Sequence, residues 1–338
     1  MRLKLQSVRC RAAVLMATAG LWLTSSGQLH AQTSQLAAPL TPQFRDVVDE
    51  AGRAVRIPQP VLRIVSLAPS LTEMVYALGI QDRLVGDTKY CDYPPDAQRK
   101  QKVGDTLNPS LEEIVALHPD LVLATKSLNR LETVVALEGL HVPAYATNTN
   151  SIEQILSSVS RLADILGVPN AGDVLAADLR HRLDDLQQHL AKVQPSRVLF
   201  VVWDEPLISV GKNTFIADAL RYAGAASIVD STQNWPQISL EEVIRQQPDF
   251  LIFTQNHASG GTVDVEALAS RPGWRGLDAV HNHRYAVISE AVNRPAPRII
   301  SAIEELARQL HPEAFDTEPP KPAAQNHGGA AGGCSCVL

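Results

Sequence analysis

Four aromatic residues fall in predicted loops, where their rings are suited to binding a broad ligand. They are Tyr90, Tyr93, Trp203 and Trp235. Aromatic residues make up only 5% of the chain, so these loops are enriched in them. A ring at the mouth of a cleft can stack on a large flat ligand while losing little rotamer entropy. The alternative is that each ring packs the base of its own loop against a sheet.

Polar residues lie in three segments that each follow a predicted strand, and two of these segments carry three of the rings. The segments are Lys89–Tyr93, Trp203–Glu205 and Glu290–Arg294. In open parallel α/β sheets, ligands bind beyond the carboxyl ends of the strands. We therefore expect these segments to lie around one binding site.

The chain lacks the sequence signatures of common catalytic sites. It contains no G-x-S-x-G, P-loop, H-E-x-x-H or G-x-G-x-x-G motif. An exported α/β enzyme, the alternative, would need a clustered nucleophile and base, so we expect no catalytic residue. His281-x-His283, or Cys334-x-Cys336 with His327, could ligate a metal. Exposed loops and a terminal extension explain these residues more simply, so we expect no resident metal or cofactor.

The first 31 residues have the pattern of a secretory signal peptide. Four basic residues precede position 12, and residues 12–23 form an apolar run of 12 residues. Such a run is too short to span a bilayer, which argues against a membrane anchor. Ala31 then offers a small residue for cleavage. The pattern predicts export to an oxidising compartment, the periplasm in a Gram-negative host.

Composition and charge predict an acidic, soluble protein. Apolar residues make up 45% and charged residues 20% of the 338 residues, which is ordinary for a globular protein. Loss of residues 1–31 removes four basic and no acidic residues, so the formal net charge falls from −6 to −10. Such an acidic chain is a poor binder of nucleic acid, and we expect no nucleic-acid partner.

One segment occurs twice, 129 residues apart: residues 110–123 read SLEEIVALHPDLVL and residues 239–252 read SLEEVIRQQPDFLI. In each copy a serine predicts a helix N-cap, with a glutamate three residues later completing a capping box. These pairs are Ser110 with Glu113 and Ser239 with Glu242. The proline then ends the helix and a buried strand follows. Two copies of one helix–strand unit predict two similar lobes that enclose a cleft.

Predicted strands and helices alternate along the chain, which indicates parallel sheets with helices on their faces. A third S-x-x-E pattern, Ser70–Glu73, predicts another capping box at a helix start. A helix over about residues 171–193 would be roughly 35 Å long. It could be a rigid strut between the lobes or an ordinary surface helix of one lobe. The predicted fold class is α/β, with two similar lobes of mainly parallel sheet joined by one long rigid helix.

These features divide the chain into six parts. They are a signal peptide (1–31), a leader and hairpin (32–61), an N-terminal α/β lobe (62–169), an interlobe helix (170–194), a C-terminal α/β lobe (195–315) and a disordered tail (316–338).

Five segments resemble the periplasmic cobalamin-binding proteins of ABC importers: RIVSLAPSLTEMVYALG, VGDTKYCDYPP, NPSLEEIVALHPDLVLA, WPQISLEEV and NRPAPRII. This family belongs to the class III substrate-binding proteins, which also carry haem and ferric siderophores. The likeness covers about residues 44–312. It implies a periplasmic monomer that binds cobalamin as a transported ligand between its lobes. It also implies delivery to a permease dimer of the inner membrane with its ATPase subunits.

The resemblance also implies roles for individual residues. Ligand contacts are implied for Tyr90, Trp235, Glu290, Ala291, Val292, Asn293 and Arg294, of which Asn293 and Arg294 match best. Trp203 is suggested by its position alone. One exposed glutamate per lobe docks into arginine pockets of the permease, and the matching residues are Glu112 and Glu241. An acid in a first helical turn also stabilises the helix by roughly 0.3–1 kcal/mol, so both roles can hold.

Two departures from the family pattern concern the ligand. Residues 196–315 contain no cysteine, whereas some relatives have a disulfide there, and the Glu290 segment lacks aromatic residues. Haem or a ferric siderophore is therefore the alternative ligand. Tyr90 or Tyr93 could ligate haem iron, and Arg294 could meet an anionic siderophore. A sensor subunit built from the same lobes is a further alternative.

Overall fold

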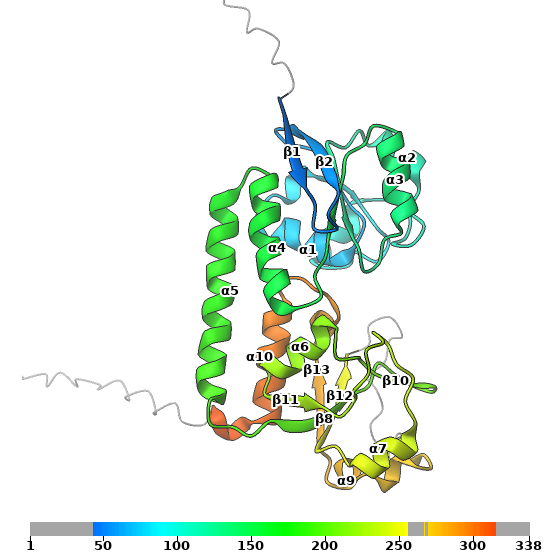
Figure 1. Ribbon diagram of the computed structural model, residues 1–338, viewed down its shortest axis with the longest axis vertical. Coiled ribbons are helices and arrows are strands. Elements are labelled where there is room, and N and C mark those ends of the chain that lie inside the picture. Colours follow the sequence, from blue (N-terminus) through cyan, green and yellow to red (C-terminus); the bar gives the residue numbers. More distant parts are fainter. Residues whose placement is uncertain (1–42, 256–266, 268–269, 316–338) are drawn as a thin grey trace, which may run out of the picture. The chain divides into compact units, whose positions relative to one another are not determined.

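The computed structural model describes residues 43–255, 267 and 270–315 (Figure 1). The predicted signal peptide, most of the leader and the predicted tail lie outside these residues. Among the described residues, no helix is both long and apolar enough to cross a membrane.

An antiparallel hairpin opens the described chain, as the sequence predicts. It pairs β1 (Gln43–Val48) with β2 (Ala54–Gln59). Its turn is held by Asp49, whose Oδ1 accepts hydrogen bonds from the backbone N–H groups of Ala51 at 3.0 Å and Arg53 at 2.8 Å.

The first sheet has the strand order β5-β4-β3-β6-β7, and every neighbouring pair is parallel. Its strands are β3 (Ile64–Ser66), β4 (Leu84–Asp87), β5 (Gln101–Lys102), β6 (Leu121–Thr125) and β7 (Ala144–Thr147). Its helices are α1 (Pro69–Ala77), α2 (Leu111–Ala116), α3 (Leu131–Gly139) and α4 (Ile152–Ile165). This sheet and its helices form the N-terminal lobe.

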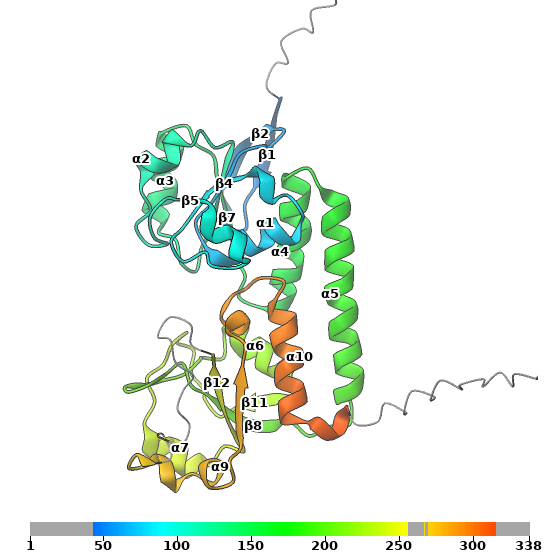
Figure 2. The same ribbon diagram turned by 180° about the vertical axis from the view of Figure 1, so that it is seen from behind.

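The second sheet has the order β11-β8-β12-β13 and is also parallel throughout. Its strands are β8 (Ser196–Phe200), β11 (Ala225–Ser227), β12 (Phe250–Thr254) and β13 (Tyr285–Ile288). Its helices are α6 (Phe215–Tyr222), α7 (Leu240–Gln246), α9 (Asp278–His281) and α10 (Ile299–Leu310). Figure 2 shows β12 and β13 side by side with α10 next to them. These elements form the C-terminal lobe.

Alternating side chains of the strands bury both faces of each sheet. In the first sheet, Ile64 and Leu123 pack on one face and Val65 and Val122 on the other. The face with Ile64 shares one hydrophobic cluster with residues of the second sheet such as Val198. The remaining face of each sheet has a cluster of its own. One core is therefore common to both lobes.

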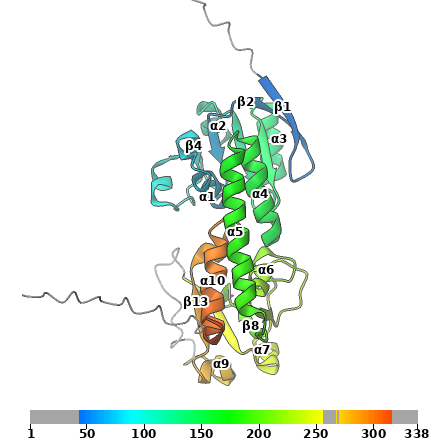
Figure 3. The ribbon, with the colours of Figure 1, turned by 90° about the vertical axis from the view of Figure 1, so that its left-hand side faces the viewer.

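The long helix α5 (Pro169–Leu190) connects the two lobes, three residues short of the predicted end. It lies beside α4 and α10 (Figure 3). Its buried stripe enters the shared core through Leu179, Leu183, Leu186 and Leu190. Arg182 also donates to Glu304 of α10 at 2.9 and 2.8 Å. The strut interpretation is confirmed, whereas the exact domain boundaries at 62, 170 and 195 stay predictions.

The repeated segment folds in the same way in both lobes. Ser110 and Ser239 cap α2 and α7, as predicted, by accepting hydrogen bonds from the N–H groups of Glu113 and Glu241, both at 3.2 Å. The repeated aspartate then caps the neighbouring strand. Asp120 accepts from the N–H of Arg63 and Asp249 from that of Arg197, both at 2.8 Å.

The same two arginines complete the equivalence of the repeats. Arg63 donates to the carbonyl of Leu117 at 2.6 Å, and Arg197 to that of Gln246 at 2.8 Å. Each guanidinium thus satisfies a carbonyl at the end of the repeated helix, where backbone acceptors lack partners.

Three predicted capping partners are wrong. The Glu113 side chain does not complete a capping box, because the Ser110 N–H donates to the Val103 carbonyl at 2.9 Å. Glu242 does not return to Ser239 but binds Arg245, with Oε2 2.9 Å from Nε. The pattern Ser70–Glu73 is not a helix start either, because α1 already begins at Pro69 and Ala68 is its N-cap. Proline favours the first position of a helix, so Ser70 lies inside it. The Glu73 carboxylate is thereby free for a different partner.

Candidate ligand-binding site

The loop after β4 carries Tyr90 next to the buried Cys91. The Cys91 Sγ lies 3.2 Å from Thr72 Oγ1 and 3.3 Å from Thr88 Oγ1. Burial raises the pKa of this thiol, which keeps it neutral. Cys91 thus anchors the loop while the neighbouring Tyr90 stays 51% exposed, with Lys89 Nζ 5.1 Å from its ring centroid.

Two exposed tryptophans lie in a second group, on the C-terminal lobe. Trp203 begins β9 (Trp203–Asp204), which pairs with β10 (Leu207–Ile208), and Ile208 bridges to Gln237 beyond Trp235. The two rings are 51% and 52% exposed. Trp203 Nε1 donates to the Glu205 carbonyl at 2.8 Å, which fixes its ring.

The loop that carries Trp235 lies closely against the chain after β10. A Cβ at Gly211 would meet the carbonyl oxygen of Gln233 at 1.7 Å. Any other residue at 211 would therefore push the loop away. The Gly211 N–H also donates to the Asn234 carbonyl at 3.0 Å, next to Trp235.

The segment after β13 is the short 3-10 helix η5 (Glu290–Asn293), and its residues do not share one environment. Asn293 is exposed, and its Nδ2 lies 3.5 Å from Thr254 Oγ1. Ala291 and Val292 are only 3% and 1% exposed and belong to the shared core. Their side chains are turned away from solvent, so only their backbone could face a ligand.

Arg294 follows η5 and is held by carboxylates of both lobes. Its Nη1 lies 3.0 Å from Glu73 Oε1 and 2.7 Å from Asp92 Oδ1, and its Nη2 lies 3.7 Å from Glu290 Oε1. Burial by itself lowers the pKa of this guanidinium, but the bonds to Asp92 and Glu73 outweigh it and raise the pKa. Burial by itself raises the pKa of Asp92, but the bond to Arg294 outweighs burial and the pKa is lowered overall.

These ion pairs join the carboxyl edges of the two sheets. Glu73 lies on α1 after β3, and Asp92 lies after β4. Arg294 comes after β13, at the carboxyl edge of the second sheet. Trp203 follows β8 at the same edge. Both edges, where ligands bind in parallel sheets, therefore meet. Of the segments predicted to surround one site, Lys89–Tyr93 and Glu290–Arg294 are in contact through Asp92 and Arg294, and the ligand role of their residues stays a prediction.

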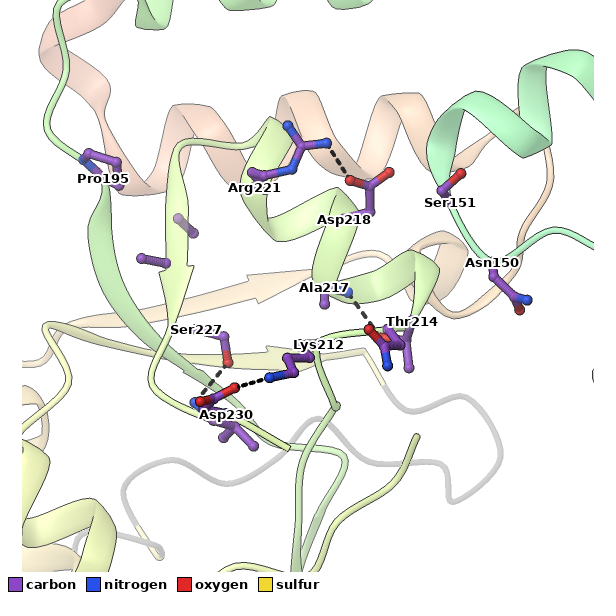
Figure 4. Close-up of a pocket in the computed structure, with 14 residues that line it drawn as sticks. Asn150, Ser151, Pro195, Lys212, Thr214, Ala217, Asp218, Arg221, Ser227 and Asp230 are labelled. Atoms are coloured by element: carbon purple, nitrogen blue, oxygen red, sulfur yellow. Dashed lines mark hydrogen bonds and ion pairs between the residues drawn. The ribbon is translucent and has the colours of Figure 1, made fainter. Parts of the chain in front are cut away.

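A separate pocket of about 730 Å³ lies beside α6 and β11 (Figure 4). Two ion pairs line it, Lys212 with Asp230 at 2.6 Å and Arg221 with Asp218. None of the predicted ligand residues lines this pocket. Because these four charged groups already pair with one another, we do not assign a ligand to it.

Sequence reasoning missed Glu73 and Arg298. Arg298 donates to Glu73 from Nε and Nη2, both at 2.8 Å, and its guanidinium lies 3.6 Å from the centroid of the Tyr93 ring. The available signal was Pro69, which places Glu73 in a helix interior rather than in a capping box.

The chain belongs to the periplasmic binding protein family, whose profile matches residues 64–291. This family and the fold define a class III substrate-binding protein, with two parallel-sheet lobes joined by one long helix. No described feature is inconsistent with that class.

Two curated relatives are similar over most of their length. The chain is 32% identical over 259 residues to a vitamin B12-binding protein of Vibrio cholerae, which covers 75% of this chain and 90% of the relative. It is 30% identical over 313 residues to an ABC transporter substrate-binding lipoprotein of Bacillus subtilis, which covers 90% of this chain and 97% of the relative. One relative is named for binding vitamin B12 and the other for binding the substrate of an ABC transporter.

Two solved structures are similar in fold and sequence. The periplasmic vitamin B12-binding protein of Vibrio cholerae has a TM-score of 0.66 and 30% identity, covering 76% of this chain and 98% of the other. A periplasmic haem-binding protein of Roseiflexus has a TM-score of 0.66 and 25% identity, covering 75% and 99%.

Proposed function

We propose that this chain is the substrate-binding component of an ABC importer and binds a corrinoid between its two lobes. The observation that carries the proposal is the meeting of the two sheet edges at Glu73 and Arg294, where Arg294 also binds Asp92 of the loop that carries the exposed Tyr90. The similarity to vitamin B12-binding proteins supports the corrinoid. In this role the protein captures and releases its ligand and is not an enzyme.

The proposed ligand contacts are a subset of the predicted residues. Tyr90, Trp203 and Trp235 offer exposed rings to the broad faces of a corrin. Asn293 and the backbone of η5 offer hydrogen bonds to its amide fringe. Glu290 is half-buried near Arg294 and acts through that residue.

The charge around Arg294 favours a near-neutral ligand. Its guanidinium and that of Arg298 are already engaged by carboxylates. An anionic siderophore that displaced Glu73 would leave a buried carboxylate unpaired, which is costly. A corrin needs stacking and hydrogen bonds instead of a free cation.

Export and docking complete the proposal. Residues 1–31 direct the chain to the periplasm and are cleaved, and the exported protein acts as a monomer. It delivers the ligand to a permease dimer of the inner membrane that carries ATPase subunits. Glu112 and Glu241, one in each lobe, are the proposed docking residues. The ABC transporter relative supports this partner class.

Haem is the second candidate because a haem-binding structure has the same fold at 25% identity. Tyr90 is the proposed iron ligand in that case, since Tyr93, although 42% exposed, is held by a cation–π contact with Arg298.

A pair of titrations tests the proposal. Purified exported protein is titrated with cyanocobalamin and, separately, with haemin, followed by calorimetry and visible absorption. We expect heat and a visible-band shift with cyanocobalamin at micromolar concentrations. Absence of both at tens of micromolar would sink the corrinoid assignment, and a protein-bound Soret band with haemin would replace it with haem.

A further inference from the structure

The Glu73 carboxylate is buried in one lobe and is bound by two arginines of the other. Its side chain is only 3% exposed, and Arg294 and Arg298 donate to it at 3.0, 2.8 and 2.8 Å. These partners are 221 and 225 residues further along the chain. Hydrogen bonds between charged groups are among the strongest in proteins, especially where an arginine binds with two nitrogens.

The same two arginines hold the loop that carries Tyr90. Arg294 binds Asp92 at 2.7 Å, two residues after Tyr90. Arg298 lies over the ring of Tyr93 at 3.6 Å, an additional cation–π contact. The loop after β4 and the segment after β13 are therefore tied to each other through side chains anchored at Glu73.

The cluster forms only when the two lobes are correctly placed. A buried carboxylate without its partner is strongly destabilising, because the charge remains out of water and uncompensated. Both arginines that form ion pairs with Glu73 belong to the C-terminal lobe, so its charge is compensated only when that lobe is in place. Any relative movement of the lobes at this edge breaks several charged hydrogen bonds together.

We propose that Glu73 is a positioning residue that holds the two ligand loops in register, so that ligand affinity depends on a side chain too buried to serve as a ligand contact itself. The proposal rests on the proposed function for the identity of the ligand. Rigid placement of both loops before binding raises affinity, because less freedom is lost on binding.

The first experiment compares two glutamates with the same chemistry. Glu73→Gln removes the charge at the lobe edge, and Glu304→Gln removes the partner of Arg182 between α5 and α10. Glu304 is also partly buried and bound by two nitrogens of one arginine. Cyanocobalamin Kd and dissociation rate are measured together with the melting temperature of the unliganded protein.

We expect Glu73→Gln to raise Kd at least about tenfold, mainly through faster dissociation. Glu304→Gln should leave Kd within about twofold even if its melting temperature falls equally. A folded Glu73→Gln variant with wild-type Kd would overturn the proposal, and so would equal losses in both variants. Asp92→Asn removes the charge of the partly exposed partner of Arg294 and should also raise Kd, but by less than Glu73→Gln does.

A second measurement needs no ligand. Spin labels are placed at the exposed positions Lys126 and Glu205, one in each lobe. To restrict labelling to these two positions, Cys10, Cys334 and Cys336 are replaced by serine in the background protein. The remaining Cys91 is buried. We expect one narrow distance distribution in this background and a broader one after Glu73→Gln.

The two measurements separate the two proposals. If the wild-type protein does not bind cyanocobalamin, the proposed function fails, and the distance distributions alone decide the role of Glu73. If cyanocobalamin binds but Glu73→Gln changes neither Kd nor the distribution, the proposed function survives and the positioning role is wrong.

Discussion

Glu112 and Glu241 occupy the same second position of equivalent helices, α2 in one lobe and α7 in the other, and both side chains are exposed. The equivalence extends to their surroundings, because Asp120 and Asp249 cap the neighbouring strands in the same way. A partner with two-fold symmetry needs one charge presented twice in equivalent places. The duplicated unit meets that requirement.

Replacing both acids should separate binding from delivery. We expect the Glu112→Ala/Glu241→Ala variant to bind ligand with unchanged Kd, because neither residue takes part in the ion pairs at the sheet edges. Corrinoid uptake by cells that depend on the importer should fall to background.

The matched control for this experiment uses acids in first helical turns outside the repeat. Glu132 of α3 and Asp278 of α9 are exposed acids of this kind. Their double alanine variant should transport normally. Uptake that persists without Glu112 and Glu241 would contradict the docking role.

Removing the proposed stacking rings should weaken ligand binding. We expect Tyr90→Ala and Trp235→Ala each to raise Kd by roughly tenfold, equivalent to about 1.4 kcal/mol, because each loses a flat contact surface. Calorimetry with cyanocobalamin measures the change. Phe44→Ala is the control, since Phe44 is an aromatic of equal exposure, 50%, on the hairpin strand β1. If all three variants bind alike, the aromatic site is misplaced.

Local patterns of the sequence predicted most of the elements, because each depends on residues close together in the chain. Ser110 and Ser239 bind backbone groups two or three residues away, and both caps were predictable. The buried strands around Val65 and Val122 follow from runs of apolar residues. Very short edge strands such as β11 lack such a run and were not predicted.

The site was less predictable because its bonds connect distant parts of the chain. Glu73 fits a local capping pattern, but its partners are more than 200 residues away. Arg294 could be assigned to a ligand only while its carboxylate partners were unknown. Ala291 could be placed beside a ligand only while its burial was unknown.

The buried Asp87 should make stability depend on pH. Its side chain has no exposed surface, and burial raises its pKa from 3.8 to about 6 although Lys102 Nζ lies 2.7 Å from Oδ1. Among the described residues, no hydrogen-bond partner reaches its Oδ2. Because the folded state holds this proton more tightly than the unfolded state, the stability contribution falls as pH rises from about 4 to about 6.

We expect Asp87→Asn to remove this dependence. The free energy of unfolding of the Asp87→Asn variant minus that of the wild type should rise by on the order of 2 kcal/mol between pH 4 and pH 7. Urea denaturation at several pH values measures it. Asp105→Asn is a control of opposite sign, because backbone hydrogen bonds from Asn108 and Leu107 lower the Asp105 pKa. A flat difference for Asp87→Asn would show that its proton is not retained on folding.

Leu183 tests whether the two lobes unfold together. It lies on α5, is 3% exposed and belongs to the core shared by both sheets. Leu183→Ala should lower the free energy of unfolding by about 2–5 kcal/mol, because the deleted methyl groups leave a cavity. Val174 of the same helix is 72% exposed, so Val174→Ala should change it by less than about 0.5 kcal/mol.

The shape of the transition carries the stronger test. Because one hydrophobic cluster spans both lobes, loss of packing at Leu183 should destabilise both at once and preserve a single cooperative transition. Urea denaturation followed by tryptophan fluorescence and by far-ultraviolet circular dichroism should then give coincident curves. Two separated transitions in Leu183→Ala, with one lobe still folded, would mean that α5 only links the lobes and does not couple their stability.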